Sequence, residues 1–158
     1  MKNIFTLLFF VFSYLASGQV VINELDSDTP STDDREFIEL KSTTPNFPLD
    51  GYVLVFFNGN ATSTTANQSY YTIDLDGLTT DANGIILIGN ALISPAPDKI
   101  VADNIIQNGA DGVGLYLGNP SDFPEFSLAT TTNLIDALMY DTNDADATDL
   151  MNLLGVTT

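Results

Sequence analysis

Apolar residues occur in short runs separated by polar segments, and this pattern predicts a chain built from strands. The runs are Val20–Leu25, Phe37–Leu40, Tyr52–Phe57, Tyr70–Leu75, Ile85–Ile88, Val113–Leu117 and Leu134–Tyr140. They are rich in β-branched and aromatic residues, and turn signals such as Asp50-Gly51 and Asp76-Gly77 lie between them. Short strands at regular spacing predict an all-β fold, an antiparallel sandwich or barrel.

Two segments depart from the simple strand pattern. Tyr52–Phe57 (YVLVFF) is the most hydrophobic stretch after the N-terminus, so we expect a central strand that is buried on both faces for part of its length. The only predicted helix is short and C-terminal. It has Thr148 as its cap, runs over Asp149–Leu154 and stops at Gly155.

The N-terminus has the pattern of a signal peptide. Lys2 precedes an apolar run over Ile4–Leu15, and the small residues Ala16-Ser17-Gly18 follow. The alternative is a membrane anchor, but a span needs about 20 apolar residues and a strand pattern begins just after Gln19. We therefore predict a signal peptide over 1–18, a domain over 19–158, secretion to the cell surface or medium, and no membrane span after cleavage.

Composition narrows the classes of function. The formal net charge is -17, from 21 acidic and 4 basic residues, and such a surface repels nucleic-acid phosphate and anionic lipid. We expect no direct binding to nucleic acid. The chain has no His and no Cys, which excludes Ser-His-Asp and Cys-His catalysis and the usual zinc ligand sets. We therefore expect no enzyme activity from this chain by itself.

Clustered carboxylates are the sharpest candidates for a metal site. The candidate calcium ligands lie in one loop, bracketed by Glu24 and Glu36, and are Asp26, Asp28, Asp33 and Asp34. Calcium takes oxygen ligands from flexible loops, yet the spacing matches no known calcium loop, so a solvated acidic loop is the alternative. A second cluster is Asp141, Asn143, Asp144, Asp146 and Asp149; helix capping explains part of it and metal binding is the alternative.

Two further groups of residues each allow two interpretations. Glu24 and Glu39 can face each other across a strand pair as an acid and base couple. The alternative is a structural role, in which Glu39 forms an ion pair with Arg35 or Lys41 or a hydrogen bond to nearby backbone. A second group could line a sugar-binding face or belong to the core: Tyr52, Phe56, Phe57, Tyr70, Tyr71 and Tyr116.

Five blocks in a fixed order resemble the lamin-tail domain family in its bacterial secreted form. They are Val21–Leu25, Glu36–Leu40, Leu49–Leu54, Gly109–Tyr116 and Ile135–Tyr140. The resemblance implies an immunoglobulin-like β-sandwich and no shared catalytic residues. Where the family usually has Trp after the glycine of the third block, this chain has Tyr52. Bacterial members are typically modules of larger exported proteins, beside nuclease or phosphatase domains or sorting tails.

Three functional hypotheses follow. The first is a secreted, non-catalytic module that binds a protein or glycan at the cell surface, through a sheet edge or the polar loop Asn58–Ser69, with calcium ordering the acidic loops. The second is an accessory module covalently linked to a nuclease or phosphoesterase domain beyond Thr158. The third is a free-standing enzyme that uses Asp and Glu alone, such as a glycoside hydrolase, although a small sandwich usually offers too little cleft.

Overall fold

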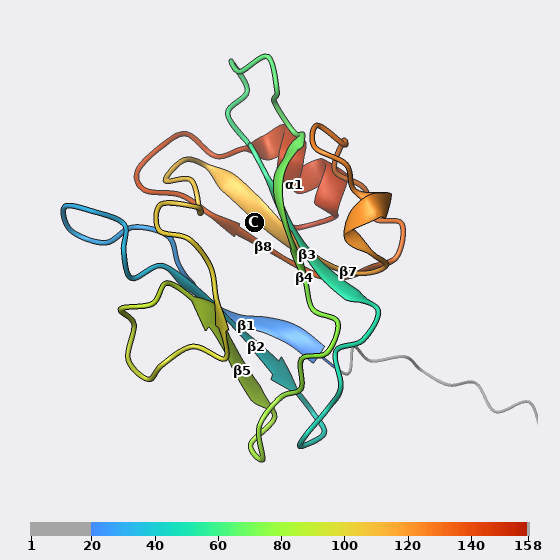
Figure 1. The fold of residues 1–158 in the computed structure, drawn as a ribbon. Coiled ribbons are helices and arrows are strands. Elements are labelled where there is room, and N and C mark those ends of the chain that lie inside the picture. Colours follow the sequence, from blue (N-terminus) through green and yellow to red (C-terminus); the bar gives the residue numbers. More distant parts are fainter. Residues whose placement is uncertain (1–19, 158) are drawn as a thin grey trace, which may run out of the picture.

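The protein folds as a sandwich of two β-sheets. The computed structural model describes residues 20–157. Its strands are β1 (Val20–Asp26), β2 (Phe37–Ser42), β3 (Tyr52–Phe57), β4 (Ser69–Asp74), β5 (Ile85–Gly89), β6 (Lys99–Ile100), β7 (Asp111–Leu117) and β8 (Leu134–Tyr140). The first sheet has the order β1-β2-β5-β6 and the second sheet the order β4-β3-β7-β8 (Figure 1). The predicted all-β sandwich with a short C-terminal helix is confirmed; the predicted signal peptide over 1–18 lies outside the described residues.

Details of the elements differ from the prediction. β6 was not predicted, because it has only two residues, and it pairs with β5 in parallel, whereas the other strand pairs are antiparallel. A 3₁₀ turn, η1 (Pro120–Asp122), occupies a predicted loop. The helix α1 (Thr148–Leu154) starts one residue early, with Ala147 rather than Thr148 at the cap position, and ends at Gly155 in a left-handed conformation as predicted.

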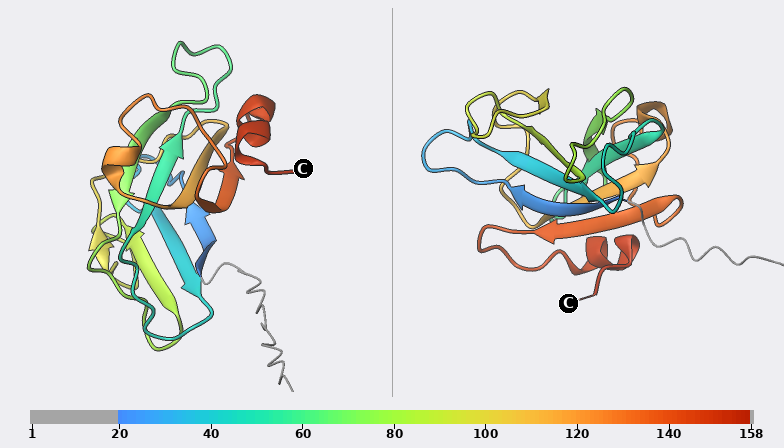
Figure 2. Two further views of the ribbon diagram at one scale, coloured as in Figure 1. Left: turned by 90° about the vertical axis from the view of Figure 1, so that its right-hand side faces the viewer. Right: turned by 90° about the horizontal axis from the view of Figure 1, so that it is seen from below.

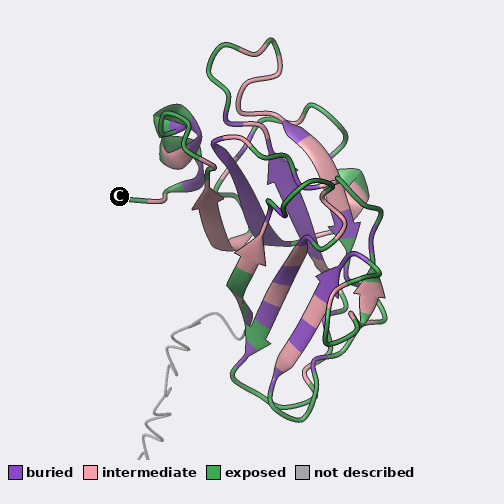
Figure 3. Ribbon diagram, turned by 90° about the vertical axis from the view of Figure 1, so that its left-hand side faces the viewer, coloured by how far each residue is buried: buried purple, intermediate pink, exposed green. Residues whose placement is uncertain are grey.

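The main core lies between the two sheets. Inward positions alternate along the strands of the first sheet, as Ile38 and Leu40 do on β2. They pack in one cluster with residues such as Leu54 and Phe56 on β3. The charged and half-exposed residues between them therefore face outward from the first sheet, and Figure 3 shows this as alternating buried and half-buried bands.

A second, smaller core covers the other face of the second sheet. Val53, Val55 and Phe57 of β3 pack in one cluster with Leu150 and Leu154 of α1. The helix lies against the outer side of this sheet in Figure 2. As expected for Tyr52–Phe57, the strand is therefore central and buried on both faces.

Edge strands of the two sheets meet along one side of the sandwich. β1 is an edge of the first sheet and β8 an edge of the second, and they lie side by side in Figure 2. The N–H of Ile22 donates a hydrogen bond of 2.8 Å to Asp136 Oδ2 on β8. This bond falls where the β1–β2 register shifts by a bulge, between Ile22 and Glu24. No helix among residues 20–157 is long and apolar enough to cross a membrane.

Candidate functional site

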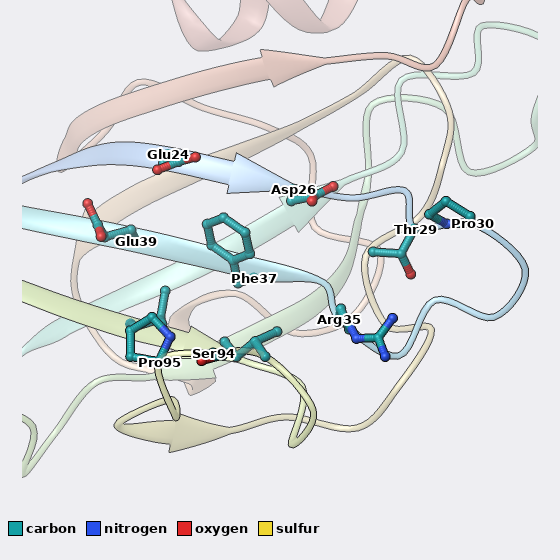
Figure 4. A pocket seen from close by; sticks show the side chains of 11 residues that line it. Glu24, Asp26, Thr29, Pro30, Arg35, Phe37, Glu39, Ser94 and Pro95 are labelled. Carbon is teal, nitrogen blue, oxygen red and sulfur yellow. The ribbon is translucent and has the colours of Figure 1, made fainter.

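The outer face of the first sheet contains a hollow of about 390 Å³. Residues from β1, β2 and β5 form its floor, and the loops on either side of them form its walls (Figure 4). The lining residues are Glu24, Asp26, Thr29, Pro30, Arg35, Phe37, Glu39, Leu87, Ile93, Ser94 and Pro95. An apolar floor is thus surrounded by carboxylates and a single guanidinium.

Strand register explains why these side chains meet. Glu24 on β1 is the partner of Glu39 on β2, and Glu39 is in turn the partner of Leu87 on β5. Since alternate residues of a strand point to the same face, Phe37 stands next to Glu39 on that face. Phe37 is itself the partner of Asp26 on one side. Because the inward set is apolar, every side chain of this group must face water.

Glycine at position 89 shapes one wall. Gly89 is the partner of Phe37 on the β5 side, and a Cβ there would lie 2.8 Å from both the Ile93 Cδ1 and the Phe37 Cβ atoms. The missing side chain therefore lets Ile93 lie against the sheet beside Phe37. Asn90 fixes the start of the loop that follows β5 and carries Ile93. Its Oδ1 accepts the Glu36 N–H at 2.6 Å, and its Nδ2 donates to the Ala102 carbonyl at 2.8 Å.

The carboxylates of Glu24 and Glu39 have no cationic partner within residues 20–157. The one ion pair there joins Arg35 to Asp34, at 4.0 Å, and the Arg35 side chain is 62% exposed. Glu39 Oε1 instead accepts a hydrogen bond of 2.6 Å from Asn23 Nδ2. Of the two expected uses of Glu39, an ion pair with Arg35 or Lys41 and a hydrogen bond to nearby backbone, neither is found; the side-chain amide of Asn23, at the bulge of β1, donates to it instead.

The four aspartates predicted as calcium ligands are used separately. Asp26 Oδ1 accepts the Asp28 N–H at 3.3 Å. Asp33 accepts the Thr29 N–H at 3.0 Å and Asn108 Nδ2 at 2.9 Å, while Asp34 faces Arg35. Within residues 20–157 no group of three or more acidic side chains is arranged to hold a metal ion. Calcium binding by this loop stays a prediction, and the geometry gives it no support.

The second acidic cluster and the aromatic set also have structural roles. Asp141 Oδ1 accepts the Asn143 N–H at 2.8 Å. Asp149 lies in the first turn of α1, where the helix dipole favours a negative charge, but no side chain makes a cap hydrogen bond to this helix, so the predicted capping is wrong. Phe56, Phe57 and Tyr116 are fully buried. The other predicted aromatics, Tyr52, Tyr70 and Tyr71, pack against the main core, so the core interpretation of these residues is right.

Two buried carboxylates were not predicted. Glu36 Oε2 accepts the N–H groups of Ile105 and Ile106 at 2.9 and 3.4 Å, and Asp111 Oδ1 accepts the Gly59 N–H at 2.7 Å. Among the described residues, the second oxygen of each is buried without a hydrogen-bond partner. Burial raises the pKa of both carboxyls above the ordinary value, against the lowering effect of the backbone N–H donors. Each one ties a loop to the end of the sandwich.

A partly buried pair of tyrosines lies near these acids. The hydroxyls of Tyr70 and Tyr140 are 3.1 Å apart, and the Gln107 N–H donates to the Tyr70 hydroxyl at 3.2 Å. Burial raises the pKa of both tyrosines well above the usual value. They stay neutral at physiological pH and serve as anchors for the loop that follows β6.

The hollow itself is the feature that sequence reasoning missed. Its acids were identified, but Leu87, Ile93 and Pro95 come from a later strand and its loop, and only the fold brings them to β1 and β2. A signal did exist in Ile85–Gly89 (IILIG). Every second residue of this run must face outward, and both Ile85 and Leu87 are half-buried there. An apolar residue on the outer face of a sheet marks a surface suited to contact.

An open face limits the chemistry that this site can perform. Glu24 is exposed and Glu39 half-buried, whereas carboxylates that act as general acid and base usually work in a water-excluded site that separates their protonation states. The arrangement suits attraction of a cation and contact with an apolar group. No protein-family model, curated protein or solved structure matches this chain.

Proposed function

We propose that the protein is an exported, non-catalytic β-sandwich module that binds a partner outside the cell through the hollow on its first sheet. One observation carries the proposal: an apolar floor of Phe37 and Leu87 lies open beside the paired carboxylates of Glu24 and Glu39. Ligand sites combine apolar lining with a few polar groups that fix orientation. The partner is a protein or glycan at the cell surface.

Sequence patterns support the other parts of this proposal. The signal-peptide pattern of residues 1–18 supports export, and the absence of His and Cys removes the common hydrolytic mechanisms. The resemblance to the lamin-tail domain favours a module without catalytic residues. The two-layer architecture is compatible with that resemblance, but many unrelated proteins share such an architecture.

Binding to the cells that secrete the protein tests the proposal. Fluorescently labelled protein is expected to bind these cells in a saturable manner. Leu87→Gln should weaken the apparent affinity by roughly tenfold, because the apolar contact with the floor is lost. The matched variant is Leu117→Gln, at a residue that ends β7 on the other sheet and is 44% exposed; it should bind like the unchanged protein.

Two results would contradict the proposal. Equal binding by Leu87→Gln and the unchanged protein, with equal melting temperatures, would remove the hollow as the contact site. Turnover of DNA, a phosphoester or a polysaccharide by the purified protein, abolished by Glu39→Gln, would make the protein an enzyme.

A further inference from the structure

We infer that the hollow receives the side chain of a Lys or Arg residue from a partner protein, with its alkyl stem over Phe37 and its charged end between Glu24 and Glu39. The inference rests on the proposed function and specifies the chemistry of the group that is bound.

The pairing of Glu24 with Glu39 is unfavourable without a cation. The two residues are direct partners across β1 and β2, and like charges at such positions destabilise a strand pair. The Asn23 amide satisfies one oxygen of Glu39 but brings no charge. No Lys or Arg nitrogen within residues 20–157 lies within 4.0 Å of either carboxylate. A cation placed between them removes the repulsion and gains two partners.

The floor suits the stem of a long cationic side chain. Phe37 lies two residues before Glu39 on the same strand face, so about 6.6 Å of sheet separates an aromatic surface from the carboxylates. Lys and Arg side chains lay their methylene stems along apolar surface while the charged end stays in a polar setting. Leu87, next to Glu39 on β5, extends the apolar surface.

The electrostatic field of the whole molecule also favours a cationic partner. The formal net charge is -17, and such a surface attracts cations over long range and speeds their association. Arg35 is the sole basic residue that lines the hollow. Its side chain is largely exposed to solvent and forms an ion pair with Asp34. Arg35 should therefore oppose binding of a basic partner, and its removal should strengthen that binding.

The shape of the hollow favours a side chain of a larger partner over a free polyamine. At about 390 Å³ it lies near the low end for pockets that enclose a small molecule. Figure 4 shows it open on the outer side of β1 and β2, between the loop that carries Thr29 and Pro30 and the loop that carries Ser94 and Pro95. A partner chain that covers this face can place one side chain in the hollow and contact both loops.

A titration with matched peptides tests the inference. The protein is expressed from the full 158-residue sequence, labelled with ¹⁵N and followed by NMR. The first probe is a capped peptide of sequence Gly-Leu-Arg-Leu-Gly, and the second has citrulline, the neutral isostere of Arg, in place of Arg. We expect the Arg peptide to shift amide signals of β1, β2 and β5, and to bind roughly fivefold more tightly than the citrulline peptide at low salt.

Variants then assign the effect to the carboxylates. Glu24→Gln and Glu39→Gln should each weaken binding of the Arg peptide by roughly fivefold, and Arg35→Gln should strengthen it. Glu125→Gln is the matched control, because Glu125 is an exposed glutamate in another loop. This variant should bind the Arg peptide like the unchanged protein. Unchanged spectra of the free variants outside the substituted sites show that the fold is kept.

The outcomes separate the inference from the proposed function. If both peptides bind the hollow equally, or Glu24→Gln and Glu39→Gln have no effect, the cation is not recognised and the inference fails while the proposed function stands. If the Arg peptide shifts signals elsewhere or none at all, the inference also fails, and saturable cell binding sensitive to Leu87→Gln would still support the function. Tighter binding of spermidine than of the Arg peptide at the same residues would replace the partner protein by a free polyamine.

Discussion

The two sheets of this sandwich differ in what covers their outer faces. The second sheet buries Val53, Val55 and Phe57 in a second core, to which α1 contributes, so its central strand has apolar residues on both sides. In the first sheet, β2 presents Phe37, Glu39 and Lys41 outward without a covering helix. The outer face of the second sheet is packed and contributes to stability, whereas the outer face of the first sheet is open and available for contact.

Sequence pattern and burial correspond in both sheets. The continuous apolar run YVLVFF belongs to a strand that is buried on both faces, and the alternating run FIELKS belongs to a strand with one face in water. An apolar residue at an outward position of the alternating sheet, such as Phe37 or Leu87, then stands out against this pattern. Such exceptions on the outer face of the first sheet are therefore the places to look for a binding surface.

A truncation in α1 should change the free energy of unfolding most, and it tests whether the helix seals the outer face of the second sheet. Leu150→Ala removes a fully buried side chain of α1 that lies beside Gly112 of β7 in the second core, and it should lower the free energy of unfolding by about 2–5 kcal/mol. Urea denaturation measures this change. Leu153→Ala lies on the same helix at a residue that is 38% exposed, and its effect should be well under half as large. Equal effects of the two variants would mean that the helix does not seal this face.

A pH series tests whether the buried carboxyl of Glu36 is shielded from water in the folded protein. Because the pKa of Glu36 is raised from 4.5 in the folded protein, folding favours the protonated carboxyl. The resulting stabilisation is complete below the ordinary pKa and is lost as the pH rises through the raised value. Glu36→Gln should therefore make the free energy of unfolding fall less between pH 4 and pH 7 than it does in the unchanged protein.

Urea denaturation at each pH gives the two curves for Glu36→Gln and the unchanged protein. Glu125→Gln supplies the control, since its side chain is exposed and the pH dependence should stay as it is in the unchanged protein. Parallel curves for Glu36→Gln and the unchanged protein would show that this carboxyl is hydrated in solution.

Removal of one charge on β1 should change the free energy of unfolding least, and it tests the outer face of the first sheet. Glu24→Gln removes one charge of the Glu24–Glu39 pair, so it should raise the free energy of unfolding by about 0.2–1 kcal/mol at low salt. The gain should shrink at 1 M NaCl, where charges are screened beyond about 3 Å. Thermal and urea unfolding at both salt concentrations measure it. A destabilised variant at low salt would mean that the pair is already balanced by a cation.

Much of the fold was predictable because its strands are marked by local patterns. The runs at Phe37–Leu40 and Tyr52–Phe57 became β2 and β3, and the stop at Gly155 follows from its left-handed conformation. β6 was missed because two residues, Lys99–Ile100, carry no periodicity. The cap at Ala147 was missed because Thr148, a preferred cap residue, already has its place inside the helix.

The site was only partly predictable, because it depends on contacts between distant segments. Glu24 and Glu39 were identified, since both lie among β-forming residues. The neutral partner of Glu39, Asn23, is brought to it by a bulge that no local pattern marks. The burial of Glu36 and Asp111 depends on loops that are distant from them in the chain. Acidic residues in a turn-rich sequence otherwise look solvated.

The hydrogen bond from the Ile22 N–H to Asp136 Oδ2 bears on the behaviour of the protein at high concentration. An unpaired edge strand is a template on which another chain can add as an extra strand and start a fibril. Here the carboxylate occupies one of the donors that such an addition needs, and it brings a negative charge to the seam between β1 and β8. A similarly charged neighbour would be repelled from this seam, so the aspartate that joins the two sheets should also disfavour the addition of a second chain at this edge.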